Sequence, residues 1–108
     1  MTSFDDRERG FEAKYARDEE MQFRILARRN RLLGEWAAGL MGLTPAESEA
    51  YAKDVVRSDF EEAGEEDVIR KLLGDLTAAQ VDIDDARIRE ALSDKTVDAR
   101  RQLMESSD

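Results

Sequence analysis

Three arginines, Arg24, Arg28 and Arg31, follow one another at spacings of four and three residues. This spacing places side chains on one face of a helix. Guanidinium groups bind carboxylates and phosphates through several N–H donors at once. One interpretation is therefore an electrostatic contact with an acidic partner surface or with the phosphates of a nucleotide. The other is a solvated helix face that pairs with acidic helices of the same chain, since no glycine-rich phosphate loop accompanies the arginines.

The sequence offers few residues suited to enzymatic catalysis, because its 108 residues include neither histidine nor cysteine. The chain thus lacks the usual general base near neutral pH and the thiolate nucleophile. Glu65, Glu66 and Asp67 are consecutive, so they do not converge on one point of a helix, and the helix dipole accounts for them. We predict no enzyme, no metal and no required cofactor, with ADP or ATP as an alternative regulatory ligand.

A second set of candidate residues lies in the N-terminal stretch FDDRERGFEAKY. Phe4, Phe11 and Tyr15 stand seven and four residues apart, so a helix would align them along one strip. Their neighbours are mostly charged, and Gly10 costs a helix about 1 kcal/mol relative to alanine. The free segment is therefore marginal as a helix. Either the aromatic residues fold back onto the rest of the chain, or the segment orders as a helix in the groove of a partner.

Helical periodicity and turn signals divide the remaining chain. They predict helices at about 20–41, 45–62, 65–77 and 84–104. Thr44, Pro45 and Glu47 have the spacing of a capping box that starts the second helix, and Gly42 is the expected stop of the first. Each predicted helix carries one apolar stripe. We therefore predict an all-α protein: a four-helix bundle of residues 20–108 with a mobile N-terminal segment of residues 1–19.

Several expectations concern single positions in this bundle. The stripe of the first helix comprises Ile25, Leu26, Leu32, Leu33, Trp36, Leu40 and Leu43. Arg29 falls on its apolar side, so we expect a structural ion pair with a carboxylate such as Asp59. Gly74 inside the third helix indicates close packing. Asp82 is the predicted N-cap of the last helix.

The composition limits the cellular compartment and the binding partners that we expect for this protein. The formal net charge is −9, which disfavours nucleic acid and anionic membrane surfaces. Within this acidic chain, residues 21–43 carry a net charge of +3. The sequence shows neither a signal peptide nor a membrane span, and the absence of cysteine suits a reducing compartment. We expect a cytoplasmic protein, not embedded in a membrane and monomeric when free.

Residues 3–44 and 49–76 resemble the ATP synthase zeta subunit family of α-proteobacteria. The specific motifs are FDDRERGFEAKYARDEE and VVRSDFEEAG. The resemblance implies a non-catalytic inhibitor that binds the catalytic head of F-type ATP synthase and blocks ATP hydrolysis. It also implies that the protein is held at the inner membrane, as a peripheral protein, through its binding to that enzyme. The family's inhibitory element corresponds to residues 1–19, thought to enter the head as a helix. The contacts predicted there are Phe4, Asp5, Arg7, Arg9, Phe11, Lys14 and Tyr15. A small regulatory protein that binds adenine nucleotide through Arg24, Arg28 and Arg31 is the alternative.

Overall fold

The computed structural model describes the backbone of residues 2–61 and 65–105 and the side chains of residues 19–58 and 65–105. Within these ranges the chain forms no strand and folds into α1 (Thr2–Met41), α2 (Pro45–Glu61), α3 (Glu65–Ala78) and α4 (Asp85–Glu105). The prediction of an all-α, four-helix chain is confirmed. None of these described helices combines the length and the hydropathy that a membrane crossing would require.

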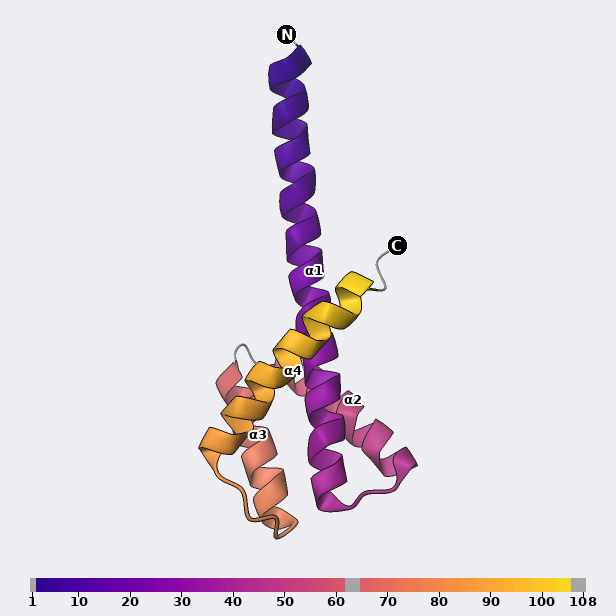
Figure 1. Cartoon of the computed structure of the whole chain (residues 1–108), viewed down its shortest axis with the longest axis vertical. Coiled ribbons are helices and arrows are strands. Elements are labelled where there is room, and N and C mark those ends of the chain that lie inside the picture. The colour runs from indigo at the N-terminus through magenta and orange to yellow at the C-terminus, as the bar shows by residue number, and fades with distance from the viewer. Residues whose placement is uncertain (1, 62–64, 106–108) are drawn as a thin grey trace.

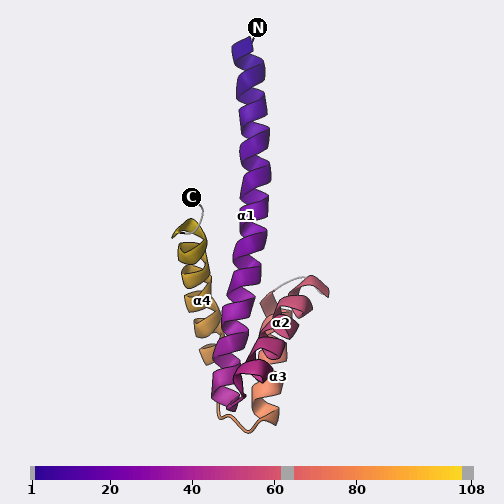
Figure 2. The ribbon, with the colours of Figure 1, turned by 90° about the vertical axis from the view of Figure 1, so that its right-hand side faces the viewer.

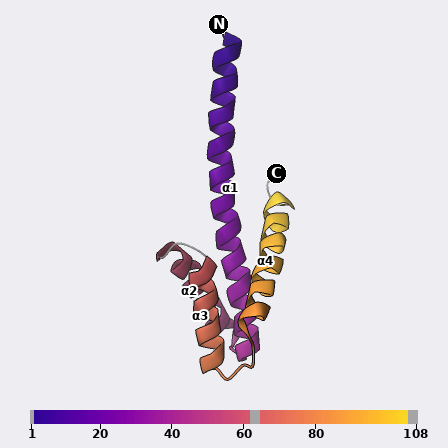
Figure 3. The ribbon, with the colours of Figure 1, turned by 90° about the vertical axis from the view of Figure 1, so that its left-hand side faces the viewer.

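α1 is the central column of the molecule (Figure 1). It packs against α2, α3 and α4, and α3 also packs against α2 and α4. α2 and α4 flank α1 on different sides (Figure 2, Figure 3). The three shorter helices surround only the C-terminal half of α1, so its N-terminal half extends alone along the 65 Å longest dimension of the molecule.

The first helix begins earlier than the predicted residue 20. Its backbone is helical from Thr2 onward and passes through Gly10 without a break. A glycine lowers helix stability by about 1 kcal/mol but, unlike proline, neither removes a hydrogen bond nor causes a clash. The side chains of residues 1–18 lie outside the described part of the chain. The division into a mobile segment, 1–19, and a bundle, 20–108, therefore stays a prediction.

The turn between α1 and α2 has the predicted geometry. Gly42 has a φ of 71°, and the Leu43 N–H donates to the Ala38 carbonyl at 3.1 Å, as in a Schellman motif. The Thr44 N–H donates to Glu47 Oε1 at 2.8 Å, and the Glu47 N–H donates to Thr44 Oγ1 at 3.2 Å. The hydrogen bond from the Thr44 backbone N–H, and after it that from the Thr44 hydroxyl, hold the pKa of the Glu47 carboxyl below its usual value. The capping box is confirmed.

The N-cap of α4 is Asp84, so the prediction of Asp82 is wrong. The Asp84 carboxylate accepts a hydrogen bond from the Arg87 N–H at 2.9 Å. Aspartate at either position gives the same local signal. Packing decides between them, because Val81 and Ile83 pack against the core and the chain becomes helical only after them.

The core takes side chains from all four helices. Its buried members are Leu33, Ala37, Val55, Val68, Ile69, Leu72, Leu76, Ile88, Ala91 and Leu92. Two members of the predicted α1 stripe are misplaced, since Leu26 is 37% and Leu40 45% exposed. The buried residues of α1 run from Ile25 to Ala38, so both leucines sit at the ends of the packed stretch.

A glycine does mark close packing, but it is not Gly74. A Cβ added at Gly74 would meet nothing within 4 Å. At Gly34 the same Cβ would lie 2.7 Å from Ala52 Cα, on the backbone of α2. The absence of a side chain at Gly34 therefore sets how closely α1 and α2 approach. Gly74 lies at an exposed position of α3, where only its helix propensity counts.

Ion pairs tie α3 to α2. Lys71 Nζ lies 2.8 Å from Asp54 Oδ2 and 3.0 Å from Asp75 Oδ2, and the Tyr51 hydroxyl donates to Asp75 at 2.7 Å. The hydrogen bond from Lys71 lowers the pKa of Asp54. Burial by itself lowers the pKa of Lys71, but its two carboxylate partners outweigh this and raise it. Burial, followed by the hydrogen bond to Asp75, raises the pKa of Tyr51.

A second ion pair ties α3 to α4. Arg89 donates through both terminal nitrogens to Glu66, at 2.8 and 2.7 Å, and also pairs with Asp85. The hydrogen bonds from Arg89 lower the pKa of Glu66. Together the two sets of ion pairs position α3, the shortest helix, against both of its neighbours.

Candidate functional site

The projecting part of α1, residues 2–18, is the first candidate. At 1.5 Å per residue it is roughly 25 Å long. Its ribbon stands clear of α2, α3 and α4 in all three views (Figures 1, 2 and 3). The seven predicted contact residues, from Phe4 to Tyr15, lie on this part, and their side chains fall outside the described residues. The backbone thus offers a single straight helix to a partner.

The arginine stripe is the second candidate, and it is exposed as predicted. The side chains of Arg24 and Arg31 are 60% and 54% exposed. Arg24 pairs with Glu20 at 3.0 Å and Arg31 with Glu35 at 3.3 Å, both one turn away on α1. Both of these partners belong to the same helix and not to the acidic helices of the bundle. Such exposed pairs contribute only a few tenths of a kcal/mol, so the arginines stay accessible at little cost.

Arg28, between them, reaches another helix. Its Nη1 donates to Gln102 Oε1 of α4 at 3.1 Å. A groove of about 460 Å³ opens beside it, between α1, α2 and α4. Its lining consists of Phe23, Arg24, Ala27, Arg28, Arg31, Val56 and Leu103. The three predicted arginines thus border one apolar groove, large enough for a small ligand.

Arg29 faces inward and has a structural position. It is 2% exposed, and its Nε donates to Asn30 Oδ1 at 3.0 Å. Its Nη1 lies 3.6 Å from Glu65 Oε1, at the start of α3. The expected partner, Asp59, has its side chain outside the described residues. Burial of Arg29 on the apolar side of α1 is confirmed, and the Asp59 pair stays a prediction.

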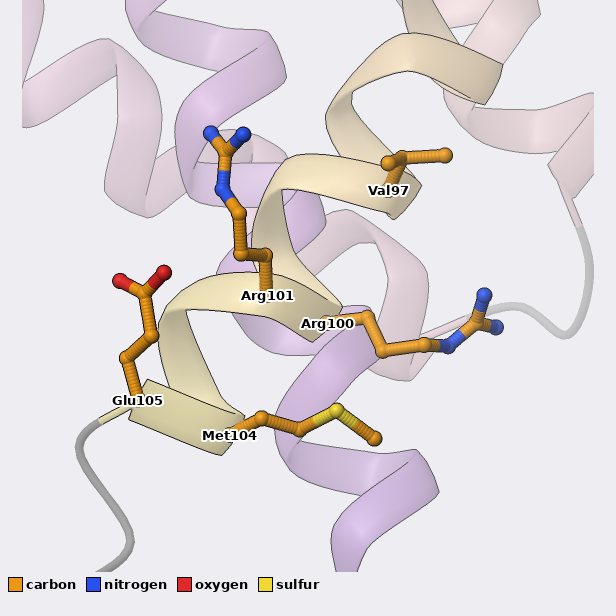
Figure 4. A pocket seen from close by; sticks show the side chains of 5 residues that line it. All are labelled: Val97, Arg100, Arg101, Met104 and Glu105. Carbon is orange, nitrogen blue, oxygen red and sulfur yellow. The ribbon is translucent and has the colours of Figure 1, made fainter.

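Sequence reasoning missed an exposed surface on α4. Val97 is 57% and Met104 66% exposed, and Arg100 and Arg101 lie between them (Figure 4). These four residues and Glu105 line a cavity of about 370 Å³. A signal was present, because Val97 and Met104 are seven residues apart and lie opposite the buried stripe of α4. Exposed apolar residues off the buried stripe are typical of an interaction surface.

Charged residues of the described chain form no cluster suited to a metal ion. Glu65, Glu66 and Asp67 occupy the first turn of α3, as predicted from the helix dipole.

Two comparisons with known proteins give matches. A sequence model of the family described as ATPase inhibitor subunit zeta matches residues 1–102. A structure determined in solution by NMR is 46% identical to this chain, with a TM-score of 0.70. That alignment covers 79% of this chain and 96% of the other. A search of curated proteins finds no match. At this identity and TM-score the two chains share their fold.

Proposed function

The chain belongs to the ATPase inhibitor subunit zeta family, and we propose that it blocks ATP hydrolysis by inserting residues 2–18 as a helix into the catalytic head of F-type ATP synthase. Family membership indicates an inhibitory, non-catalytic role. The mode of inhibition, the catalytic head as the binding site and a monomeric free state belong to the proposal. So does a cytoplasmic location, peripheral at the inner membrane through the enzyme.

One observation carries the proposal: α1 continues unbroken from the bundle into a helix that projects beyond it. An amphipathic helix presented in this way suits recognition by a groove. Phe4, Phe11 and Tyr15 have the spacing of three anchors along one strip. Three buried aromatic side chains supply of order 5–10 kcal/mol gross, and ordering a segment costs roughly 2–5 kcal/mol of this. A surplus for binding remains.

The bundle has a defined part in this mechanism. Because residues 2–18 and the packed stretch of α1 belong to one helix, the bundle fixes the direction in which the segment points. The bundle also limits how far the segment can enter the head. Inhibition then results from occupation of a catalytic interface and needs no chemistry from the chain, which fits its lack of histidine and cysteine.

Deletion of residues 1–19 tests the proposal directly. The shortened chain should stay folded but lose inhibition of ATP hydrolysis by purified ATPase. Phe11→Ala should weaken inhibition without lowering the melting temperature. Leu40→Ala, at an exposed position near the opposite end of α1, is the matched control and should inhibit like the wild type. A shortened chain that inhibits as well as the full one would show that another part of the molecule is responsible.

The groove beside Arg28 favours a second candidate function, binding of adenine nucleotide. Its volume suits a small ligand, and three arginines border it. Against it, Glu20 and Glu35 offset the charges of Arg24 and Arg31. Titration with ADP while backbone amide shifts are followed by NMR tests this function. Shifts clustered at residues 24–31 with ADP, but not with inorganic phosphate, support it, and no shifts with ADP would remove it.

A further inference from the structure

Exposed apolar side chains gather at the end of the bundle where α1 leaves it. In the part of the chain whose side chains are described, the exposed large apolar residues are Phe23, Leu26, Leu40, Val97 and Met104. All but Leu40 belong to residues 20–31 of α1 or 95–105 of α4. These stretches lie beside each other, because Arg28 bonds to Gln102 across them. Exposed apolar groups concentrated in one place indicate an interaction surface.

The stretches of α1 and α4 at this end of the bundle are basic, although the chain is acidic. Residues 20–31 and 95–105 together contain seven basic and three acidic residues. At the opposite end, where the α1–α2 and α3–α4 turns lie (Figure 1), residues 39–54 and 74–90 contain three basic and eight acidic residues. These stretches of α1 and α4 therefore differ in the sign of their charge from the turn end, and Glu65 of α3 is an acidic neighbour of Val97 and Arg100. A partner that meets the basic end is favoured if its own surface is acidic.

Six residues define this surface, which we call the exit collar: Phe23, Arg24, Val97, Arg100, Arg101 and Met104. Resting on the proposed function, we propose that the exit collar docks on an acidic, partly apolar surface of the ATPase, beside the groove that takes residues 2–18. A partner groove that takes the projecting helix comes closest to the bundle at the end from which that helix leaves. It then meets the bundle at the end that carries the collar (Figure 1, Figure 4).

The composition and geometry of the collar favour a protein surface over a small anion. Phenylalanine, methionine and arginine are enriched at protein interfaces. Figure 4 shows Arg100 and Arg101 pointing to different sides of α4, and Arg101 pairs with Asp98 at 3.3 Å. A phosphate would need donors that converge on one point. Guanidinium groups spread around a helix end are suited to several carboxylates on a broad surface.

Charge reversal tests the electrostatic part. In the full chain, Arg100→Glu with Arg101→Glu should weaken binding to the purified catalytic head about tenfold or more at low salt, and the loss should shrink as salt rises. The matched control is Lys53→Glu with Arg70→Glu, which makes the same charge change at exposed positions away from the collar. The control should change the affinity by less than about threefold. Equal losses in both variants would overturn the proposal.

A second pair of variants tests the apolar part. Phe23→Ser with Met104→Ser should weaken binding at every salt concentration, whereas Leu40→Ser should not. Because these side chains are exposed, thermal unfolding should show that every variant is folded. A collar variant that binds the catalytic head as tightly as its control would contradict docking through the collar. Raising the concentration of a collar variant should restore inhibition, because residues 2–18 are intact. If the wild type itself fails to bind the head, the proposed function fails; if only the collar variants match their controls, the docking surface fails.

Discussion

The two halves of α1 form one helix but differ in what stabilises them. Residues 25–38 bury apolar side chains against three other helices, including the fully buried Leu33. Residues 3–20 contain 11 charged residues and five apolar ones, and their ribbon stands apart from the bundle. Tertiary packing supplies most helix stability in proteins, so a half whose backbone stands clear of the bundle has less to stabilise it. The same backbone geometry thus has a packed half that anchors and an unsupported half available to a partner.

Loss of a buried side chain should separate the two halves most strongly. Leu33→Ala should lower the free energy of unfolding by about 2–5 kcal/mol, because it leaves a cavity at the centre of the bundle. Phe11→Ala should leave that free energy unchanged. Urea unfolding followed by circular dichroism measures both. An equal loss in Phe11→Ala would mean that the aromatic strip packs onto the bundle, and the contrast between the halves would fail.

A matched pair of glycines gives the next largest effect. Gly34→Ala forces a Cβ against the Ala52 backbone, and overpacking of this kind costs about 1–3 kcal/mol. Gly10→Ala meets no such obstacle if the projecting half is free, and should raise its helix stability by about 1 kcal/mol. Melting temperature reports the first change and amide exchange of residues 2–18 the second. Similar falls in melting temperature for both variants would contradict independent halves.

Local signals predicted the fold well wherever the cause was local. The capping box of Thr44 and Glu47 and the stop at Gly42 involve residues within a few positions of one another, so sequence spacing suffices. Gly34 could not be identified in this way, since its close contact is with α2, eighteen residues later. The choice of Asp84 over Asp82 likewise depended on where Val81 and Ile83 pack. Tertiary packing selected among alternatives that are locally equivalent.

The candidate site was predictable in part. Helical spacing identified the exposed arginine stripe and the inward position of Arg29. It did not reveal that Arg28 reaches Gln102, because that hydrogen bond spans 74 positions in the chain. Nor did it indicate that residues 95–105 of α4 lie beside residues 20–31 of α1. The sequence can identify the single residues of a surface that α1 and α4 form together. Only the fold shows that these residues lie next to one another.

Acid should weaken the ion pairs that join α3 to α2 and α4 in the bundle. The folded-state pKa values of Asp54 and Glu66 are lowered by Lys71 and Arg89, respectively. Their contribution is therefore complete above the unfolded pKa, near 4, and is lost as pH falls through the folded values. Both carboxylates are exposed, so the effect is modest. Between pH 6 and 2.5, the melting temperature should fall less in Asp54→Asn than in the wild type. Identical dependences of melting temperature on pH in the two proteins would exclude the Asp54–Lys71 ion pair as a cause of the acid destabilisation.

The smallest expected effect concerns the end of α3. Gln80 has a φ of 64°, the left-handed conformation in which a Schellman motif normally places glycine, and the Val81 N–H donates to the Leu76 carbonyl at 2.9 Å. Gln80→Gly should therefore raise stability by up to about 1 kcal/mol, because glycine adopts this φ without steric cost. Gln80→Ala keeps the unfavourable conformation and should give no gain. Melting temperature should rise only in the glycine variant, while amide exchange of residues 2–18 stays constant. A gain shared by both variants would assign the effect to the side chain, and a change in the exchange of residues 2–18 would show that the bundle and the projecting half are energetically coupled.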